Sequence, residues 1–383
     1  MSSRLHPDSR INPDIKTRNL SENESIHDLI EQYQLNRRGF LKTSLGVTAA
    51  AGAAAVLGTN VADSIINYAE AAPVPMGSIG FASVPANVVP MIDAVTVPIG
   101  YSAGVLVSWG DSLSSAPHWN PSGAMSESKQ KHCYGAHTDG MHYFPFSGPL
   151  GNIRGLLVTN SEYCDPALVN SIAPASAYAG AALTLDMVRA QQAAHGVNVV
   201  AVGKDLIGKG RGEWKVVRHS PFNRRITGNT PCKISGPAAG HALMKTTANP
   251  GGKRVLGTLN NCANGYTPWG TYLTCEENWN GYFGTAQPFT PTTLENRYGV
   301  VAAGFGYRWH EVDARFDVRN EPNEPHRFGW VVEIDPFDPD SIPVKRTALG
   351  RFKHESAELV VDDKNRVAVY MGDDERNEYI YKF

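Results

Sequence analysis

Several features that would point to common protein classes are absent from this 383-residue sequence. Its five cysteines contain no Cys-x-x-Cys pair, so a structural zinc site is not expected. Lysine and arginine do not cluster and the net charge is -2, which excludes a general electrostatic field for nucleic acid. No internal repeat has the period of a propeller blade. The function must therefore be inferred from the N-terminus, the strand pattern and the acidic segments.

The N-terminal apolar segment lacks the large side chains of a membrane anchor. In residues 36–42, two consecutive arginines precede Phe and Leu, which is typical of a twin-arginine export signal. Residues 40–57 are rich in Ala and Gly, which favours a signal sequence over the alternative of an uncleaved membrane span. Residues 69–71 offer a small-x-small cleavage site. We therefore expect a signal region at 1–71, a functional domain at 72–383, the twin-arginine export machinery as partner, no stable membrane anchor, and a periplasmic or secreted location.

Short β-prone runs, separated by Gly and Pro, dominate the domain. One helix is predicted over residues 177–194 from the helical spacing of Ala, Leu and Met. Many short strands with little helix indicate an all-β sandwich, barrel or propeller, and the length favours a β-propeller. An exported chain with five cysteines could also form two disulfides and keep one thiol, for which a metal site is one use. Strands are predicted over residues 155–159, 197–202, 213–217, 330–334, 366–371 and 378–383.

Acidic side chains follow predicted strands in four places. If the strand 155–159 continues, Asn160, Glu162 and Cys164 share one face; the alternative is a solvated Glu beside a buried Cys. Glu276 and Glu277 are consecutive, so a strand would send one carboxylate to each face, although a surface acidic pair is also possible. The four segments are residues 160–166, 271–278, 353–358 and 371–376.

Together these segments indicate a multinuclear metal site. Carboxylates with a thiolate and few paired histidines favour calcium, with iron where a cysteine joins, over a histidine-based zinc centre. Lys353 and Arg376, and also Arg224 and Arg225, could bind an anionic group, although each could equally be a solvated cation. For the two histidines and the aspartate within residues 134–142, a structural role is favoured.

At these residues the chain resembles the alkaline phosphatase PhoX family of exported, metal-dependent phosphatases. The stretch from Asn261 to Glu277 is the most specific part of this resemblance. The matching parts are the twin-arginine signal and residues 160–163, 235–241, 261–278, 328–339, 353–355 and 372–375.

The resemblance implies a β-propeller whose central pocket holds Ca2+ and Fe3+ and hydrolyses small-molecule phosphate monoesters. Cys262 is an alternative to Cys164 as the sulfur ligand, and Lys353 and Arg376 are the residues we assign to catalysis. The ligands that it implies are Glu162, Cys164, Glu276, Glu277, Glu355, Asp373, Asp374 and Glu375.

Two alternatives to the phosphatase remain at this stage. The first is a non-catalytic propeller that uses calcium to brace its loops, and the second is a truncated, inactive relative. The sequence ends at Phe383, earlier than the family usually does, so the propeller is expected to be incomplete. Iron content and turnover of a phosphate ester separate an enzyme from a calcium-braced module.

Overall fold

The computed structural model describes residues 84, 95–207 and 212–383 of the chain. The predicted signal region at 1–71 lies outside the described residues. Residues 103–383 form one compact unit, and the fold and site described below lie within it. No helix in the described ranges combines the length and the apolar character needed to cross a lipid bilayer.

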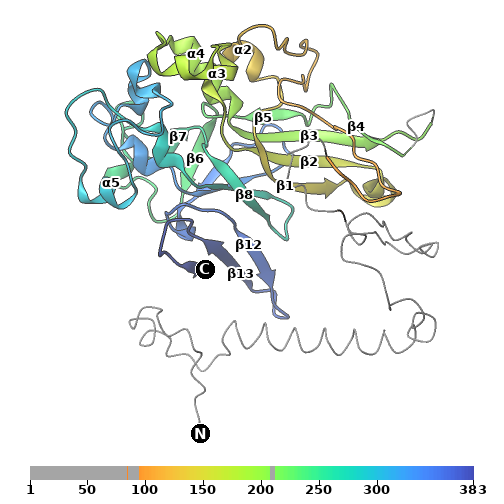
Figure 1. Cartoon of the computed structure of the whole chain (residues 1–383). Helices are drawn as coiled ribbons and strands as arrows, with labels where there is room; N and C mark the ends of the chain where they lie inside the picture. The colour runs from red at the N-terminus through yellow and green to blue at the C-terminus, as the bar shows by residue number, and fades with distance from the viewer. Residues whose placement is uncertain (1–83, 85–94, 208–211) are drawn as a thin grey trace, which may run out of the picture. The chain divides into compact units, whose positions relative to one another are not determined.

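Three β-sheets are the main regular elements of this unit (Figure 1). The first sheet contains β1 (Thr138–Pro145), β2 (Arg154–Ser161), β3 (Gly196–Lys204), β4 (Trp214–Val216) and β5 (Arg224–Ile226). The second contains β6 (Pro231–Ser235), β7 (Arg254–Leu256), β8 (Asn261–Tyr266), β9 (Tyr272–Glu276), β10 (Val331–Ile334) and β11 (Val344–Arg346). The third contains β12 (Glu358–Val361), β13 (Val367–Gly372) and β14 (Ile380–Lys382).

Antiparallel pairing dominates all three sheets. In the first, β1, β2 and β3 are neighbours, and β4 and β5 pair with opposite ends of β3. The second has the order β7-β6-β11-β10-β9-β8, with β6 and β11 parallel. The third is the meander β12-β13-β14. The regular secondary structure of the described residues is thus mostly β-sheet, as expected, while the arrangement of the sheets as propeller blades stays a prediction.

Among the residues that the structure describes, the α-helices are few and short. They are α2 (Glu127–Gln130), α3 (Pro166–Val169), α4 (Leu185–Ala194) and α5 (Thr293–Arg297). The helix predicted over residues 177–194 is confirmed only in its second half, because the Thr184 hydroxyl accepts the Met187 N–H and so caps a helix beginning at Leu185. Residues 175–180 form a 3-10 helix instead.

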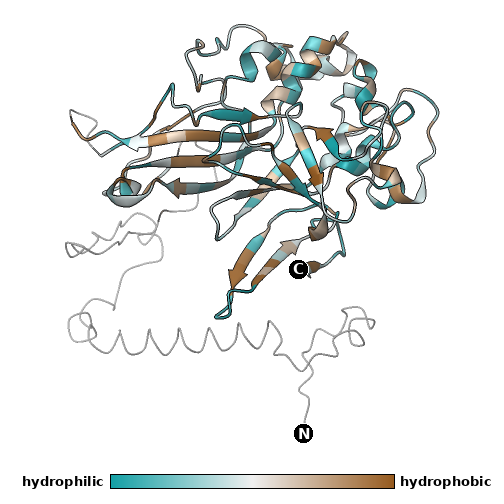
Figure 2. Cartoon of the chain, turned by 180° about the vertical axis from the view of Figure 1, so that it is seen from behind, coloured by the Kyte–Doolittle hydropathy of each residue, from teal (hydrophilic) through white to brown (hydrophobic). Residues whose placement is uncertain are grey.

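The predicted strands are confirmed at β2, β3, β4, β10, β13 and β14. β2 and β3 lie inside their sheet and are buried along most of their length, as expected of apolar runs with a neighbour on each side. Hydrophobic stretches follow these long strands in Figure 2. Their side chains pack with Tyr272 and Ile334 of the second sheet, so one apolar core joins the first two sheets.

A close backbone contact between β1 and β8 brings the two sheets together beside the site. Gly140 of β1 lies so near β8 that a Cβ atom there would come within 2.8 Å of the Asn264 side chain and 2.9 Å of the Ala263 backbone. A larger residue at 140 would push the strands apart. Asp139, the neighbour of Gly140, is thereby held beside Cys262.

Candidate metal centre

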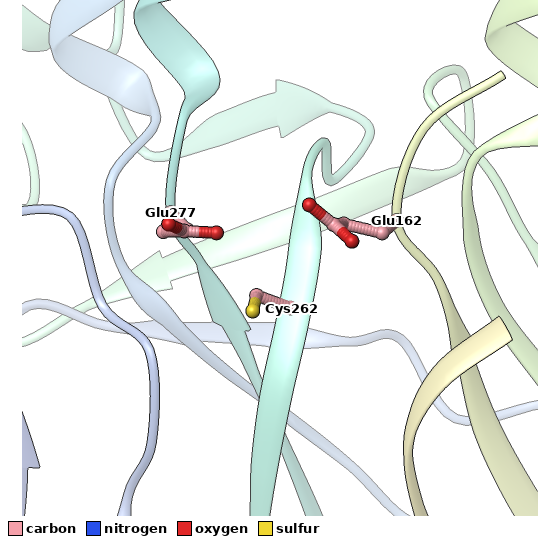
Figure 3. Close-up of side chains that lie close together, drawn as sticks. All are labelled: Glu162, Cys262 and Glu277. Carbon is pink, nitrogen blue, oxygen red and sulfur yellow. The ribbon is translucent and has the colours of Figure 1, made fainter. Parts of the chain in front are cut away.

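Five side chains from distant parts of the sequence meet in two overlapping groups. The ligand atoms of Glu162, Cys262 and Glu277 all lie within 4.8 Å of one another, and so do those of Glu277, Glu355 and Asp374. Figure 3 shows the first group, with Glu162 and Glu277 on either side of the strand that carries Cys262. Glu277 belongs to both groups. We call these five residues the carboxylate cluster.

Strand ends place the first group. Glu162 follows β2 directly, and its N–H donates to the His137 carbonyl at 3.0 Å. In the antiparallel pair of β8 and β9, Asn261 lies opposite Glu276. Cys262 is the next residue of β8 and Glu277 is the first residue after β9, so both are held at the same end of the hairpin.

Glu355 and Asp374 come from two loops that are joined by a β-bridge between His354 and Asp373. The N–H of Glu355 donates to the Gly372 carbonyl at 3.3 Å, and the N–H of Asp374 donates to the Lys353 carbonyl at 3.1 Å. The two loops thus hold each other through backbone hydrogen bonds. Both carboxylates are exposed, whereas Glu277 is buried, so the cluster has one buried end and one open end.

The protonation of these groups reflects crowded negative charge. Burial, hydrogen bonding with Asp374 and neighbouring carboxylates raise the pKa of Glu277 to about 8. Burial and the charges of Asp139 and Glu355 raise the pKa of Glu162 to about 7. Burial, a hydrogen bond with Asp139 and the charge of Glu277 raise the pKa of the Cys262 thiol well above its usual range.

These shifts describe the cluster without a cation. Carboxylates this close repel one another when ionised, and a bound cation removes that repulsion. Four carboxylates suit a hard cation such as calcium, and the single sulfur adds a ligand that iron accepts. The donor set therefore fits the metals expected from the sequence.

Glu276 lies on the other side of β9 and has a different role from the one predicted. It is fully buried, and its Oε1 lies 2.7 Å from the Lys345 Nζ. Its Oε2 accepts the N–H groups of Gly329 and Trp330 at 3.0 and 3.1 Å. Both oxygens are therefore occupied by protein donors, and Glu276 is not part of the cluster.

Cys164 is also outside the cluster. It is buried in an apolar group with Val169, Ala190 and Ala194, and burial raises the pKa of its thiol. The prediction depended on β2 continuing to residue 164, but the strand ends at Ser161 and Asp165 then caps α3. The alternation of side chains stops there, and Cys262 takes the place of the sulfur. All five cysteines are free thiols, so the two possible disulfides do not form.

Asp373 and Glu375 lie beside the cluster and bind protein groups. Asp373 accepts the N–H groups of Lys353 and Glu375 at 3.3 and 3.2 Å, which shapes the turn that presents Asp374. Glu375 pairs with the Lys353 ammonium at 2.5 Å. Neither belongs to the two groups described above.

The predicted anion-binding residues fall into two classes. Arg224 and Arg225 donate to backbone carbonyls and to neighbouring side chains within the fold, so both are structural. Lys353 is nearly buried and paired with Glu375. Arg376 is exposed beside Asp374, and its guanidinium has no partner among the residues that the structure describes.

Sequence reasoning ranked one acidic residue too low. Asp139 influences the protonation of Glu162, Cys262 and Glu355, so it lies at the edge of the cluster. The sequence signal was the group of His and Asp within residues 134–142, for which we expected a structural role. Its proximity results from the close approach of β1 and β8, which spacing along the chain does not reveal.

The chain is similar to known proteins along most of its length. The family model "Alkaline phosphatase PhoX" matches residues 79–383. A solved structure of Pseudomonas fluorescens PhoX in complex with vanadate, a transition-state analogue, matches with 48% sequence identity and a TM-score of 0.73. The match covers 79% of this chain and 50% of that one, so the chain spans about half the length of the solved relative. A search of curated proteins gave no match.

Proposed function

The chain belongs to the alkaline phosphatase PhoX family, and from this premise we propose that it hydrolyses phosphate monoesters at the carboxylate cluster. The observation that carries the proposal is a convergence of side chains that follow β2, lie at the β8–β9 hairpin and belong to two further loops, in a chain that is 48% identical to a vanadate-binding PhoX. These side chains are Glu162, Cys262, Glu277, Glu355 and Asp374. Vanadate imitates the geometry of a phosphoryl group during transfer. A site that attracts cations beside open solvent suits that chemistry.

In this proposal the five residues of the cluster hold calcium and iron. When bound, the metals neutralise phosphoryl oxygens and supply a nucleophile near working pH. The buried Glu277, shared by both groups, fixes the spacing between them, and the exposed Glu355 and Asp374 face the side from which an ester enters. The Cys262 sulfur gives the first group a ligand that favours iron.

In this proposal, two basic side chains near the open end of the carboxylate cluster bind the substrate. Arg376 adjoins the turn of Asp374, and a guanidinium can donate two hydrogen bonds to one phosphate. Lys353 supplies a second positive charge. Its ammonium pairs with Glu375 in the structure, so it must leave Glu375 to bind an oxygen of the ester. Both residues therefore bind and orient the ester, and neither transfers a proton.

We further propose that the three sheets are blades of a β-propeller and that the protein is exported before it acts. Support for the propeller comes from sheets that are mostly antiparallel and from the PhoX similarity. Support for export comes from the two arginines in residues 36–42, which lie outside the described residues.

Elemental analysis combined with a phosphatase assay tests the function. The full chain, produced through a twin-arginine export route, is expected to contain calcium and iron and to cleave a chromogenic phosphate monoester. Glu277→Gln is expected to lose both properties, whereas Glu358→Gln, on an exposed strand of the third sheet, should keep them. Wild-type protein with calcium but neither iron nor turnover would instead indicate the calcium-braced module, and protein without either metal would overturn the proposal.

A further inference from the structure

A chain of buried hydrogen bonds runs from the end of α4 toward the cluster. His195 Nδ1 lies 2.7 Å from the Gln191 carbonyl oxygen, and its Nε2 lies 2.9 Å from the Tyr282 hydroxyl. The Asn260 side-chain amide donates to that hydroxyl at 3.2 Å. His195, Tyr282 and Asn260 are all buried, so water does not compete for these bonds.

The direction of each bond follows from its partners. A carbonyl oxygen only accepts, so His195 Nδ1 carries the proton and Nε2 of the neutral ring accepts. The Tyr282 hydroxyl then donates to His195 and accepts from Asn260. Burial lowers the pKa of His195 to about 3, so the ring stays neutral and this direction is kept at ordinary pH.

Aromatic packing fixes the hydroxyl at the middle of the chain. The Tyr282 ring packs against Tyr307 and Trp309, with ring centroids 4.5 and 4.7 Å away and interplanar angles of 28° and 29°, and those two rings lie 5.5 Å from each other. A buried ring in a cluster of three aromatic side chains has little freedom to rotate. Asn260 therefore meets a hydrogen-bond acceptor at a fixed position.

Asn260 holds the backbone on both sides of the cluster. Its side-chain oxygen accepts the Asn278 N–H at 2.6 Å, and its carbonyl accepts the Glu277 N–H at 3.0 Å. Its φ of 49° lies in the left-handed region, which turns the chain two residues before Cys262. The backbone segments of Cys262 and Glu277 are thus joined at Asn260.

We propose that His195, Tyr282 and Asn260 are positioning residues that set the separation of Cys262 and Glu277. His195 fixes the Tyr282 hydroxyl, the hydroxyl fixes the Asn260 amide, and Asn260 grips the backbone of Glu277 while leading into Cys262. None of the three touches the substrate. The consequence for metal binding and turnover rests on the proposed function, whereas the effect on the backbone does not.

Tyr282→Phe tests this role because it removes one hydroxyl and keeps the stacked ring. Amide hydrogen exchange at Glu277 and Asn278 is expected to rise about tenfold, the scale of one buried hydrogen bond. The calcium concentration for half-saturation should rise by a similar factor, and kcat should fall with little change in KM.

Tyr298→Phe is the matched control. Its hydroxyl is part-buried and donates to the Arg351 carbonyl at 2.9 Å, and it bonds to none of the three positioning residues. This variant is expected to leave exchange at Glu277 and calcium affinity unchanged. If both tyrosine variants behave alike, the positioning role is wrong and Tyr282 only fills the core.

Asn260→Gly provides a second route if Tyr282→Phe folds poorly. Glycine accepts the left-handed φ but lacks the amide that reaches Asn278. We expect the same rise in exchange at Asn278, and normal protection there would overturn the inference. Hydrogen exchange is measured on metal-free protein, so it decides this inference even if wild-type protein proves inactive, a result that would count only against the phosphatase.

Discussion

Two neighbouring glutamates occupy opposite environments. Glu276 points into the fold, where Lys345 and two backbone N–H groups satisfy its oxygens. Glu277 points into the carboxylate cluster, where burial and negative neighbours raise its pKa to about 8. Glu276 is neutralised by a cationic side chain of the protein. Glu277 lies among other carboxylates, whose mutual repulsion a cation from solution would relieve.

The difference teaches how to separate a structural charge from a functional one. Burial alone does not distinguish the two residues, because Glu276 and Glu277 are both buried. Their partners distinguish them. A carboxylate paired with a cation of the protein stabilises the fold, whereas a group of unpaired carboxylates can bind a metal ion but lowers the stability of the fold. Changes at either glutamate or at its surroundings therefore test the comparison, and loss of the buried ion pair should have the largest effect.

Lys345→Met should cause the largest loss of stability. The ammonium and the Glu276 carboxylate are both fully buried, so the substitution leaves an uncompensated charge in the core. We expect a loss of about 3–5 kcal/mol in the free energy of unfolding, measured by urea denaturation. The double variant Lys345→Met with Glu276→Gln should recover most of it. An unchanged urea midpoint in the single variant would show that the ion pair contributes nothing.

Calcium should stabilise the protein through the other glutamate. A ligand at one hundred times its Kd raises the free energy of unfolding by about 2.7 kcal/mol, which thermal unfolding with and without calcium detects. Glu277→Gln should abolish this gain because Glu277 belongs to both groups. The exposed Glu358→Gln should retain it. An equal calcium effect in Glu277→Gln would place the calcium elsewhere.

The sequence predicted these two roles only in part. Consecutive positions on a strand implied that Glu276 and Glu277 face opposite ways, and the structure confirms this. The sequence could not predict which of the two glutamates joins the carboxylate cluster, because Lys345, the partner of Glu276, is 69 residues away. The prediction of Cys164 as the sulfur ligand was wrong for a local reason, because β2 ends at Ser161, before the chain reaches Cys164.

Strand positions were more predictable than contacts between sheets. Apolar runs such as residues 155–159 and 197–202 indicate buried strands whatever their partners, and both became strands of the first sheet. The proximity of Asp139 to Cys262 depends on a glycine contact between β1 and β8, which no periodicity reveals. That Glu162, Glu277 and Asp374 converge was implied by the family resemblance and not by spacing.

The free energy of unfolding of metal-free protein should depend on pH because of Glu277. The folded pKa of Glu277 is about 8, above the ordinary value of 4.5, so folded protein holds more protons than unfolded protein between these values. Stability should therefore fall as pH rises from 6 to 8, by about 2 kcal/mol. Glu277→Gln should flatten this slope, and saturating calcium should remove it. A metal-free protein whose stability rises over this range would contradict the raised pKa.

The two cysteines complete the comparison with the smallest effects. Cys164→Ser places a hydroxyl in an apolar pocket and should cost about 1 kcal/mol of stability with no change in metal content. Cys262→Ser should leave stability nearly unchanged but reduce the bound iron, because an alcohol replaces the sulfur ligand while the four carboxylates still bind calcium. Urea denaturation and elemental analysis of both variants separate the outcomes. Iron lost from Cys164→Ser and kept in Cys262→Ser would reverse the assignment, because a buried thiol outside the cluster would then control the metal.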